Sequence, residues 1–322
     1  MSEHPRDRFD LVPDAEAETA FLDAWSRNRL HHAWLVCGPE GVGKATFAYR
    51  AARRLLGAAA RPDLGPLGAD PRDAVSRLVT AQSHPDLLVL ERLVEGGKTK
   101  KSISVDQARE LPEFFAMSPS KAAWRVAIVD AADDLNLNAA NALLKVLEEP
   151  PERGVLFLIS HAPGRLLPTI RSRCRRLALP AWPEERLAAL AETRGVDRDA
   201  AAVAASAAGG SPGRLLELLD AETAEYDRLA LGWLDGEIGA AETIAMADRF
   251  RGGEGAGRFD RLYDRLLAAV KARAVSETGS TAARWAETWS RLSEAPDAVA
   301  GLNLDRGEAL AVALAEIERA RA

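Results

Sequence analysis

Residues 38–46 read GPEGVGKAT, and this stretch decides the fold expected for the chain. It follows the apolar run Ala33–Cys37 and precedes helical text from Phe47 to Leu56, so it joins a strand to a helix. The Gly-x4-Gly-Lys spacing is typical of a phosphate-binding loop, in which glycines let successive backbone N–H groups turn towards one phosphate. The following helix adds the positive end of its dipole. The stretch therefore predicts an α/β P-loop domain that cradles a triphosphate.

Five positions in this loop and helix are candidate ATP contacts: Gly38, Gly41, Gly43, Lys44 and Thr46. An ordinary glycine turn is the alternative, but it does not require a lysine at this spacing. The motif normally continues with a serine or threonine that ligates Mg²⁺, and here Ala45 has no oxygen to offer. Thr46 is not expected to replace it, because one helical residue turns a side chain by roughly 100°. We therefore expect no metal ligand in this loop.

Three further apolar runs alternate with helical text before Pro180, at Leu87–Leu90, Val126–Val129 and Val155–Ile159. Short apolar strands separated by helices are typical of a parallel sheet that helices cover on both faces. The second of these runs ends in Asp130, the position of a Walker B aspartate, which holds Mg²⁺ beside the γ-phosphate. Asp130 is therefore a further candidate ATP contact.

The residue after Asp130 is Ala131, where hydrolytic ATPases of this architecture usually carry a glutamate. That glutamate orients or deprotonates the attacking water, and alanine can do neither. Asp133 or Asp134 could compensate, or they could cap the next helix or lie in solvent. Together with Ala45, this change argues against turnover by a site that has kept the shape of its motif.

The chain is expected to form more than one domain, because a single core rarely grows beyond roughly 250–300 residues. Pro180 and Pro183 end the α/β zone, and a short helical zone follows as far as the breaker cluster GGSPG at 209–213. Beyond Asp220 the text is helical throughout. We predict an α/β domain with a parallel sheet at 1–180, a small helical domain at 181–220 and an all-α domain at 221–322.

The last of these domains has a clear helical pattern. Phe259, Leu262, Leu266 and Val270 recur at intervals of three and four and mark one apolar helix face. Glycine-rich text at 252–257 and the triplet at 278–280 predict two loops within this helical domain.

The composition excludes several classes of protein. Hydrophobic residues make up 47% of the 322 residues and charged residues 28%, which is typical of a globular chain. No run approaches the roughly 20 apolar residues of a membrane span, and the N-terminus lacks an apolar signal segment. Cys37 and Cys174 are too few for a disulfide framework, which indicates a reducing compartment. We expect a cytoplasmic protein without membrane partners.

The charge of the chain gives no general affinity for nucleic acid. The formal net charge is −6, so any contact with DNA has to come from a local patch. The basic stretch KTKK at 98–101 could touch DNA phosphates, but such a short run is usually only solvated.

Several motifs together resemble the delta-prime family in the clamp-loader branch of the AAA+ ATPases. The residues that carry this resemblance are NALLKVLEEPP at 141–151, SRC at 172–174, SHPD at 83–86, ISVDQAR at 103–109 and RLHHA at 29–33. The resemblance is dense over residues 20–180. The C-terminal part shares only a helical pattern and the GSPG stretch at 210–213. The resemblance to this family implies that residues 181–220 form a helical lid and that residues 221–322 form an oligomerising collar.

The resemblance also implies a division of labour in a five-subunit ring, in which motor subunits hydrolyse ATP and the delta-prime member is comparatively rigid. The arginine of the SRC motif reaches the ATP of a neighbouring subunit in this family, so Arg173 is the candidate arginine finger. A permanently charged, planar guanidinium suits a γ-phosphate. The alternative is that Arg171, Arg173, Arg175 and Arg176 form a solvated basic run.

Two further candidate contacts come from the same resemblance. Ser160, at the end of the run Val155–Ile159, takes the place of a polar sensor of the γ-phosphate, or it is an ordinary strand-end hydroxyl. Arg214 takes the place of a second sensor at the start of a lid helix, with an ambiguity of one residue towards Gly213.

Many relatives carry a four-cysteine zinc module between the P-loop helix and the SHPD segment, but residues 51–83 contain no cysteine. We therefore predict no zinc, and either a metal-free remnant of the module or a plain loop in its place. ATP is expected to bind weakly or without being hydrolysed.

The partners that the resemblance implies are the motor subunits and the wrench subunit of the same loader. The sliding clamp and primer–template DNA would be engaged through the whole complex. Two rival interpretations stay open: an active ATPase, either a motor subunit or a helicase-loader-like AAA+ enzyme, and a P-loop small-molecule kinase. The long helical C-terminal zone disfavours the kinase.

Overall fold

The computed structural model describes residues 4–95, 98–251, 255–293, 295–296, 299 and 305–321. The chain falls into two compact units, one within residues 2–95 and 99–216 and the other mainly within residues 217–322. The division lies inside helix α9 (Pro212–Leu219), so most of the small helical domain predicted at 181–220 is part of the first unit.

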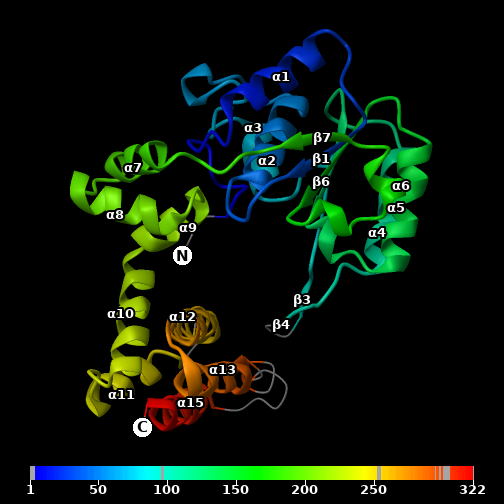
Figure 1. The fold of residues 1–322 in the computed structure, drawn as a ribbon. Helices are drawn as coiled ribbons and strands as arrows, with labels where there is room; N and C mark the ends of the chain where they lie inside the picture. The colour runs from blue at the N-terminus through cyan, green and yellow to red at the C-terminus, as the bar shows by residue number, and fades with distance from the viewer. Residues whose placement is uncertain are drawn as a thin grey trace. The chain divides into compact units, whose positions relative to one another are not determined.

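The first unit contains the predicted parallel sheet (Figure 1). Its five strands lie in the order β2-β5-β6-β1-β7, and every neighbouring pair is parallel. The strands are β1 (Ala33–Cys37), β2 (Leu87–Glu91), β5 (Arg125–Asp130), β6 (Gly154–Ser160) and β7 (Arg175–Ala178). A separate two-stranded sheet pairs β3 (Val94–Glu95) with β4 (Lys98–Thr99). The fold class predicted from the sequence is confirmed.

Helices pack on both faces of the sheet, and strands β1 and β6 are therefore buried along their whole length. Trp34 and Val36 belong to the core of one face, whereas Leu35 belongs to the core of the other, as the two-residue period of a strand requires. The first face is covered by α1 (Ala15–Ser26), α2 (Lys44–Leu55) and α3 (Ala74–Thr80). The second is covered by α4 (Val105–Ala116), α5 (Leu137–Glu148) and α6 (Pro168–Arg171).

Local sequence signals set where these helices begin. The side chain of Asp14 accepts from the backbone N–H of Ala17 at the start of α1, and Asn136 accepts from that of Ala139 at the start of α5. Helix α2 begins at Lys44, three residues before the predicted start, because Gly43 ends the loop directly before it with φ +100°. The P-loop lysine thus lies in the first turn of the helix.

The remaining helices of the first unit are α7 (Glu184–Thr193), α8 (Arg198–Ala208) and the start of α9. The second unit contains α10 (Ala221–Asp235), α11 (Ala240–Asp248), α12 (Gly255–Ser276), α13 (Gly279–Ser293) and α15 (Arg306–Arg321). Among the residues that the structure describes, none of the helices combines the length and hydrophobicity that crossing a bilayer requires.

The two loops predicted in the helical domain differ from the structure. Residues 252–254 lie outside the described residues, and residues 255–257 already belong to α12. The second break is confined to residues 277–278, because Gly279 and Ser280 start α13. Gly279 can take its φ of +63° without strain, which lets the next helix begin directly at the turn.

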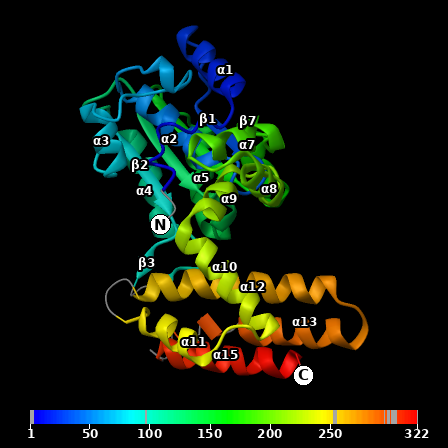
Figure 2. The ribbon, with the colours of Figure 1, turned by 90° about the vertical axis from the view of Figure 1, so that its left-hand side faces the viewer.

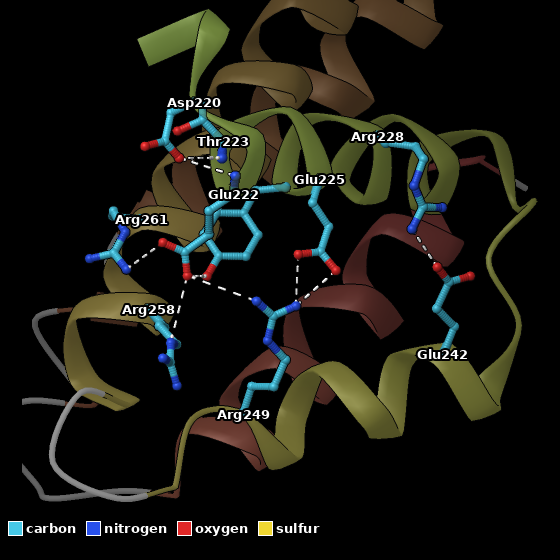
Figure 3. A network of polar contacts seen from close by, with 10 residues as sticks. Asp220, Glu222, Thr223, Glu225, Arg228, Glu242, Arg249, Arg258 and Arg261 are labelled. Carbon is cyan, nitrogen blue, oxygen red and sulfur yellow. Dashed lines mark hydrogen bonds and ion pairs between the residues drawn. The ribbon is translucent and has the colours of Figure 1, made fainter. Parts of the chain in front are cut away.

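The second unit is held by one apolar core and by a network of ion pairs. Phe259, Leu262, Leu266 and Val270 are all buried in this core, as their spacing predicts, and α12 packs along α13 (Figure 2). Glu222 of α10 accepts from Tyr226 Oη at 2.7 Å and from Arg261 Nη2 of α12 at 2.9 Å (Figure 3). Further pairs join Glu225 to Arg249 and Arg228 to Glu242. These contacts fasten α10 to the helices beside it.

Residues 56–73, between α2 and α3, are attached to the rest of the first unit by a buried ion pair. Glu18 of α1 and Arg50 of α2 are 0% and 2% exposed, and Arg50 Nε donates to Glu18 Oε1 at 2.6 Å. Glu18 Oε2 also accepts from the backbone N–H of Leu67 at 2.8 Å, and Arg50 Nη2 donates to the carbonyl of Leu64 at 2.6 Å. The loop is thereby attached to two helices.

Replacing Glu18 with alanine should destabilise the first unit by about 3–5 kcal/mol, because the guanidinium of Arg50 stays buried without its counter-charge. The measurement is urea unfolding, with limited proteolysis of residues 58–73 as a local readout. Asp23→Asn is the matched control on the same helix, since Asp23 pairs with Arg27 on the surface and should cost about 0–1 kcal/mol. Equal losses in the two variants would contradict the prediction.

Candidate functional site

The predicted phosphate loop has the strand–loop–helix geometry that its spacing indicates. Strand β1 ends at Cys37, and α2 begins at Lys44. Gly41 and Gly43 have φ values of +72° and +100°, which glycine adopts without the strain that any other residue would suffer. The loop backbone is therefore specified by its glycines, as the sequence predicts.

Lys44 is the central cation of this loop. Its side chain is only 3% exposed, and Nζ donates to the carbonyls of Gly38 at 2.9 Å and Pro39 at 2.7 Å. Burial lowers the pKa of the ammonium group, and the nearby carboxylates of Asp130 and Glu40 act in the opposite direction. The loop carbonyls thus hold the lysine at the carboxyl edge of the sheet.

Asp130 ends strand β5 at the same edge. Burial raises the pKa of its carboxyl group, whereas the charges of His161 and Lys44 lower it. Ala131 follows Asp130 directly and is 5% exposed. Ala45, in α2, is partly buried and packs against the core on the first face of the sheet. Thr46 is 1% exposed. The magnesium-binding hydroxyl and the water-orienting glutamate of the motif are therefore both replaced by methyl groups.

Ser160 ends strand β6, beside Cys37 in the sheet, and its hydroxyl donates to Asp133 Oδ1 at 2.9 Å. Asp133 also accepts from the backbone N–H of His161 at 2.7 Å and of Ala162 at 3.2 Å. Asp133 therefore binds the end of β6 and does not cap the next helix, since the N-cap of α5 is Asn136. Asp134 forms an ion pair with Arg92 at 3.2 Å.

Arg214 lies in the first turn of α9, next to the residue that bonds to the loop. Helix α9 places the N–H of Gly213 on the carbonyl of Gly41 at 2.9 Å, and a Cβ on Gly41 would lie 2.1 Å from Ser211 Oγ. Arg214 N donates to Ser211 Oγ at 3.1 Å, while its side chain is exposed. The start of α9 thus packs directly against the phosphate loop, and only glycine at 41 and 213 permits this approach.

A second contact covers the other side of the loop. A Cβ on Gly43 would lie 3.0 Å from Pro13, whose carbonyl accepts from Trp182 Nε1 at 2.8 Å. Arg186 of α7 stacks 3.4 Å over the Trp182 ring and donates to the carbonyl of Val12 at 2.6 Å. Residues 12–13 therefore link the phosphate loop to the helical part of the first unit.

Sequence reasoning did not identify Pro13, Trp182, Arg186, Ser211 or the Asp133–Ser160 contact. The breaker cluster at 209–213 could have indicated that this segment packs closely against the phosphate loop. It contains three glycines and a serine, and glycines allow two backbones to approach each other closely. The remaining contacts join segments that are far apart in sequence and carry no motif.

Arg173 lies at the opposite edge of the sheet. Strand β7 begins at Arg175, which pairs with Trp34 near the start of β1, whereas Lys44 follows the end of β1. At about 3.3 Å per residue, β1 separates the two edges by more than 10 Å. Arg173 is thus not brought together with Lys44, Asp130 and Ser160.

The side chain of Arg173 is 37% exposed, with Nη2 at 3.0 Å from Glu148 Oε1 and Nη1 donating to the carbonyl of Thr169 at 3.1 Å. The other arginines of the run have separate surroundings. Arg175 stacks 4.9 Å over the Trp34 ring, and Arg176 Nε donates to Cys37 Sγ at 3.3 Å. Arg171, Arg175 and Arg176 are all exposed, as the alternative of a solvated basic run expects.

The comparisons with known proteins find subunits of DNA polymerase III. Residues 14–183 match the family model described as DNA polymerase III, delta subunit. The DNA polymerase III subunit delta' of Pseudomonas aeruginosa is 44% identical over 149 residues, which are 46% of this chain and 43% of that protein. The subunit delta' of Escherichia coli is 35% identical over 217 residues, 66% of this chain and 60% of that protein.

The DNA polymerase III subunit gamma/tau of Mycobacterium tuberculosis is 36% identical over 219 residues, which are 66% of this chain and 36% of that protein. The chain thus spans less than two thirds of the length of each of these three relatives.

Asp130→Asn should make the first unit more stable at pH 7, because it removes a carboxylate whose charged form is disfavoured by burial. A raised pKa in the folded state destabilises the fold only where the carboxyl group is ionised. The gain should therefore be complete above the folded pKa and disappear as the pH falls below the unfolded value. Thermal unfolding between pH 4 and pH 8 measures it.

The matched control is Asp134→Asn, which removes a carboxylate that is paired with Arg92. It should leave the stability unchanged or slightly lower at pH 7. A destabilising effect of Asp130→Asn that grows with pH would show that the carboxylate is favoured where it lies.

Proposed function

Because this chain belongs to the DNA polymerase III delta subunit family, we propose that it is the delta-prime member of a clamp loader. In this role it completes a ring and serves a neighbour's ATP site without hydrolysing ATP itself. The observation that carries the proposal is the contrast between the two edges of its sheet. At one edge, Ala45 and Ala131 replace the hydroxyl that ligates Mg²⁺ and the glutamate that activates water, and at the other Arg173 lies at the surface.

The composition of the phosphate loop supports the proposal that this chain does not hydrolyse ATP. Ala45 and Ala131 offer neither a magnesium ligand nor a base. The ammonium group of Lys44 donates to the carbonyls of Gly38 and Pro39 within the chain. A nucleotide therefore has to compete with these internal contacts and binds weakly. The candidate contacts for it are Gly38, Gly41, Gly43, Lys44, Thr46, Asp130, Ser160 and Arg214.

Arg173 is the proposed arginine finger. Its guanidinium carries a permanent charge and several N–H donors, which suits the charge that develops on a γ-phosphate during transfer. Such a residue contributes roughly 10³–10⁵ in rate where it acts in trans. The sheet separates Arg173 from this chain's own phosphate loop, so the triphosphate it meets belongs to an adjacent subunit.

The proposed partners follow from the same role. The chain assembles with gamma/tau-type motor subunits and the delta wrench subunit, and the complex engages the sliding clamp and primer–template DNA in the cytoplasm. Residues 221–322 serve as the oligomerising collar, residues 181–220 as the lid and residues 1–180 as the nucleotide-binding-like domain. The names of the two delta' relatives and the gamma/tau relative support this assignment.

An active ATPase of the gamma/tau type or a helicase-loader-like enzyme is the second candidate. It is favoured by the intact glycines of the loop, by Lys44 and Asp130, and by 36% identity to a gamma/tau subunit. Ala45 and Ala131 speak against it.

The isolated chain should show no magnesium-dependent ATP hydrolysis above the level of its Lys44→Ala variant, because neither metal nor water is activated at the loop. A coupled phosphate-release assay measures both proteins. Brisk turnover by the native chain that Lys44→Ala abolishes would favour the motor interpretation.

Arg173→Ala should lower the ATPase rate of a loader reconstituted with gamma/tau-type and delta subunits, because the ATP site that the finger serves loses roughly 10³-fold or more in rate. Arg171→Ala is the matched control, two residues away on the same turn. Co-elution in size-exclusion chromatography verifies assembly. An unchanged rate in an assembled Arg173→Ala loader would remove the finger from the mechanism.

A further inference from the structure

We propose that Glu148 is a positioning residue for Arg173: it holds the guanidinium in the orientation in which it meets a neighbour's phosphate. This inference rests on the proposed function of Arg173. It concerns a carboxylate that the arginine motif itself does not contain, because Glu148 ends α5 and Arg173 follows α6.

The guanidinium is anchored at two separate nitrogens. Nη2 lies 3.0 Å from Glu148 Oε1, and Nη1 donates to the carbonyl of Thr169 at 3.1 Å. A guanidinium has five N–H donors, so these two contacts leave Nε–H and one hydrogen on each terminal nitrogen for a phosphate. Glu148 and a phosphate can therefore be bound by Arg173 together.

The backbones that carry the two side chains are fixed by one apolar core. Ile170 of α6 is 1% exposed and belongs to the same core as Leu143 and Leu147 of α5, which are 0% and 3% exposed. Helix α6 is continued by a bond from the N–H of Ser172 to the carbonyl of Pro168 at 2.9 Å. The distance between Glu148 and Arg173 is thus set by packing and not by chance contact of two mobile segments.

The contact is specific within its surroundings. Arg175 stacks on the Trp34 ring and Arg176 donates to Cys37 Sγ. Of these three arginines, Arg173 is the one that pairs with the carboxylate of α5. A carboxylate at the last residue of a helix is opposed by the helix dipole, and the guanidinium beside it offsets that cost. Because Glu148 and Arg173 are 52% and 37% exposed, their pairing adds little to folding stability. Its effect is on orientation.

Orientation matters for rate because a long arginine side chain otherwise samples many rotamers, of which few reach a given phosphate. Glu148→Gln removes the charge and keeps the size of the side chain. It should lower the kcat of the reconstituted loader and leave the KM for ATP unchanged, since the nucleotide is bound by the neighbouring subunit.

The experiment compares loaders containing native chain, Glu148→Gln, Arg173→Ala, the double variant and the control Glu149→Gln, which changes the same charge one residue along. The rate that Arg173 contributes is the difference between the native and Arg173→Ala loaders. We expect Glu148→Gln to reduce this difference by about tenfold, the lower end of the loss seen when a carboxylate that orients a metal ligand is removed. It should have no further effect once Arg173 is absent, and Glu149→Gln should match the native loader.

Each other outcome overturns a defined part of the scheme. A Glu148→Gln rate at or above the native rate, with Arg173→Ala impaired, overturns the positioning role and leaves the proposed function intact. An equal loss from Glu148→Gln in the Arg173→Ala background assigns Glu148 a structural role instead. An unimpaired Arg173→Ala loader overturns the finger and this inference together. Size-exclusion profiles and melting temperatures should be the same for all five proteins.

Discussion

The parallel pairing of β1 with both β6 and β7 is the constraint on which the proposed chemistry depends. It aligns Cys37 with Ser160 at one edge of the sheet and Trp34 with Arg175 near the other. Groups that follow the ends of the strands therefore gather around the phosphate loop, whereas the turn before β7 emerges at the far edge. This register places Lys44 and Arg173 at opposite ends of β1, which is the separation that the proposed function uses.

Polar groups in and beside the phosphate loop are hydrogen-bonded to other groups of the same chain. Lys44 donates to two loop carbonyls, Ser160 donates to Asp133, and the carbonyl of Gly41 accepts from Gly213. Buried polar groups cost free energy unless they are hydrogen-bonded, and here the chain supplies the partners. The glycines and the lysine of the motif thus contribute to the packing of the first unit.

The sequence was sufficient for features that short-range patterns encode. The apolar runs predicted the parallel sheet, the glycine spacing predicted the loop before α2, and Ala45 and Ala131 could be assessed from their positions alone. Contacts such as Gly41 with Gly213, or Glu18 with Arg50, could not be predicted, because they depend on how distant segments pack. Glu148 lies inside a motif, yet only the packing of α5 on α6 relates it to Arg173.

The ion pair between Glu18 and Arg50 has a consequence for the conditions under which this fold survives. Thiolate clusters lose their ions to chelators and are attacked by peroxide, which converts cysteine to sulfenic and higher acids. A carboxylate and a guanidinium have no comparable chemistry, and residues 51–83 contain no sulfur ligand to oxidise. This loop should therefore keep its attachment to α1 and α2 in the presence of chelators and of peroxide.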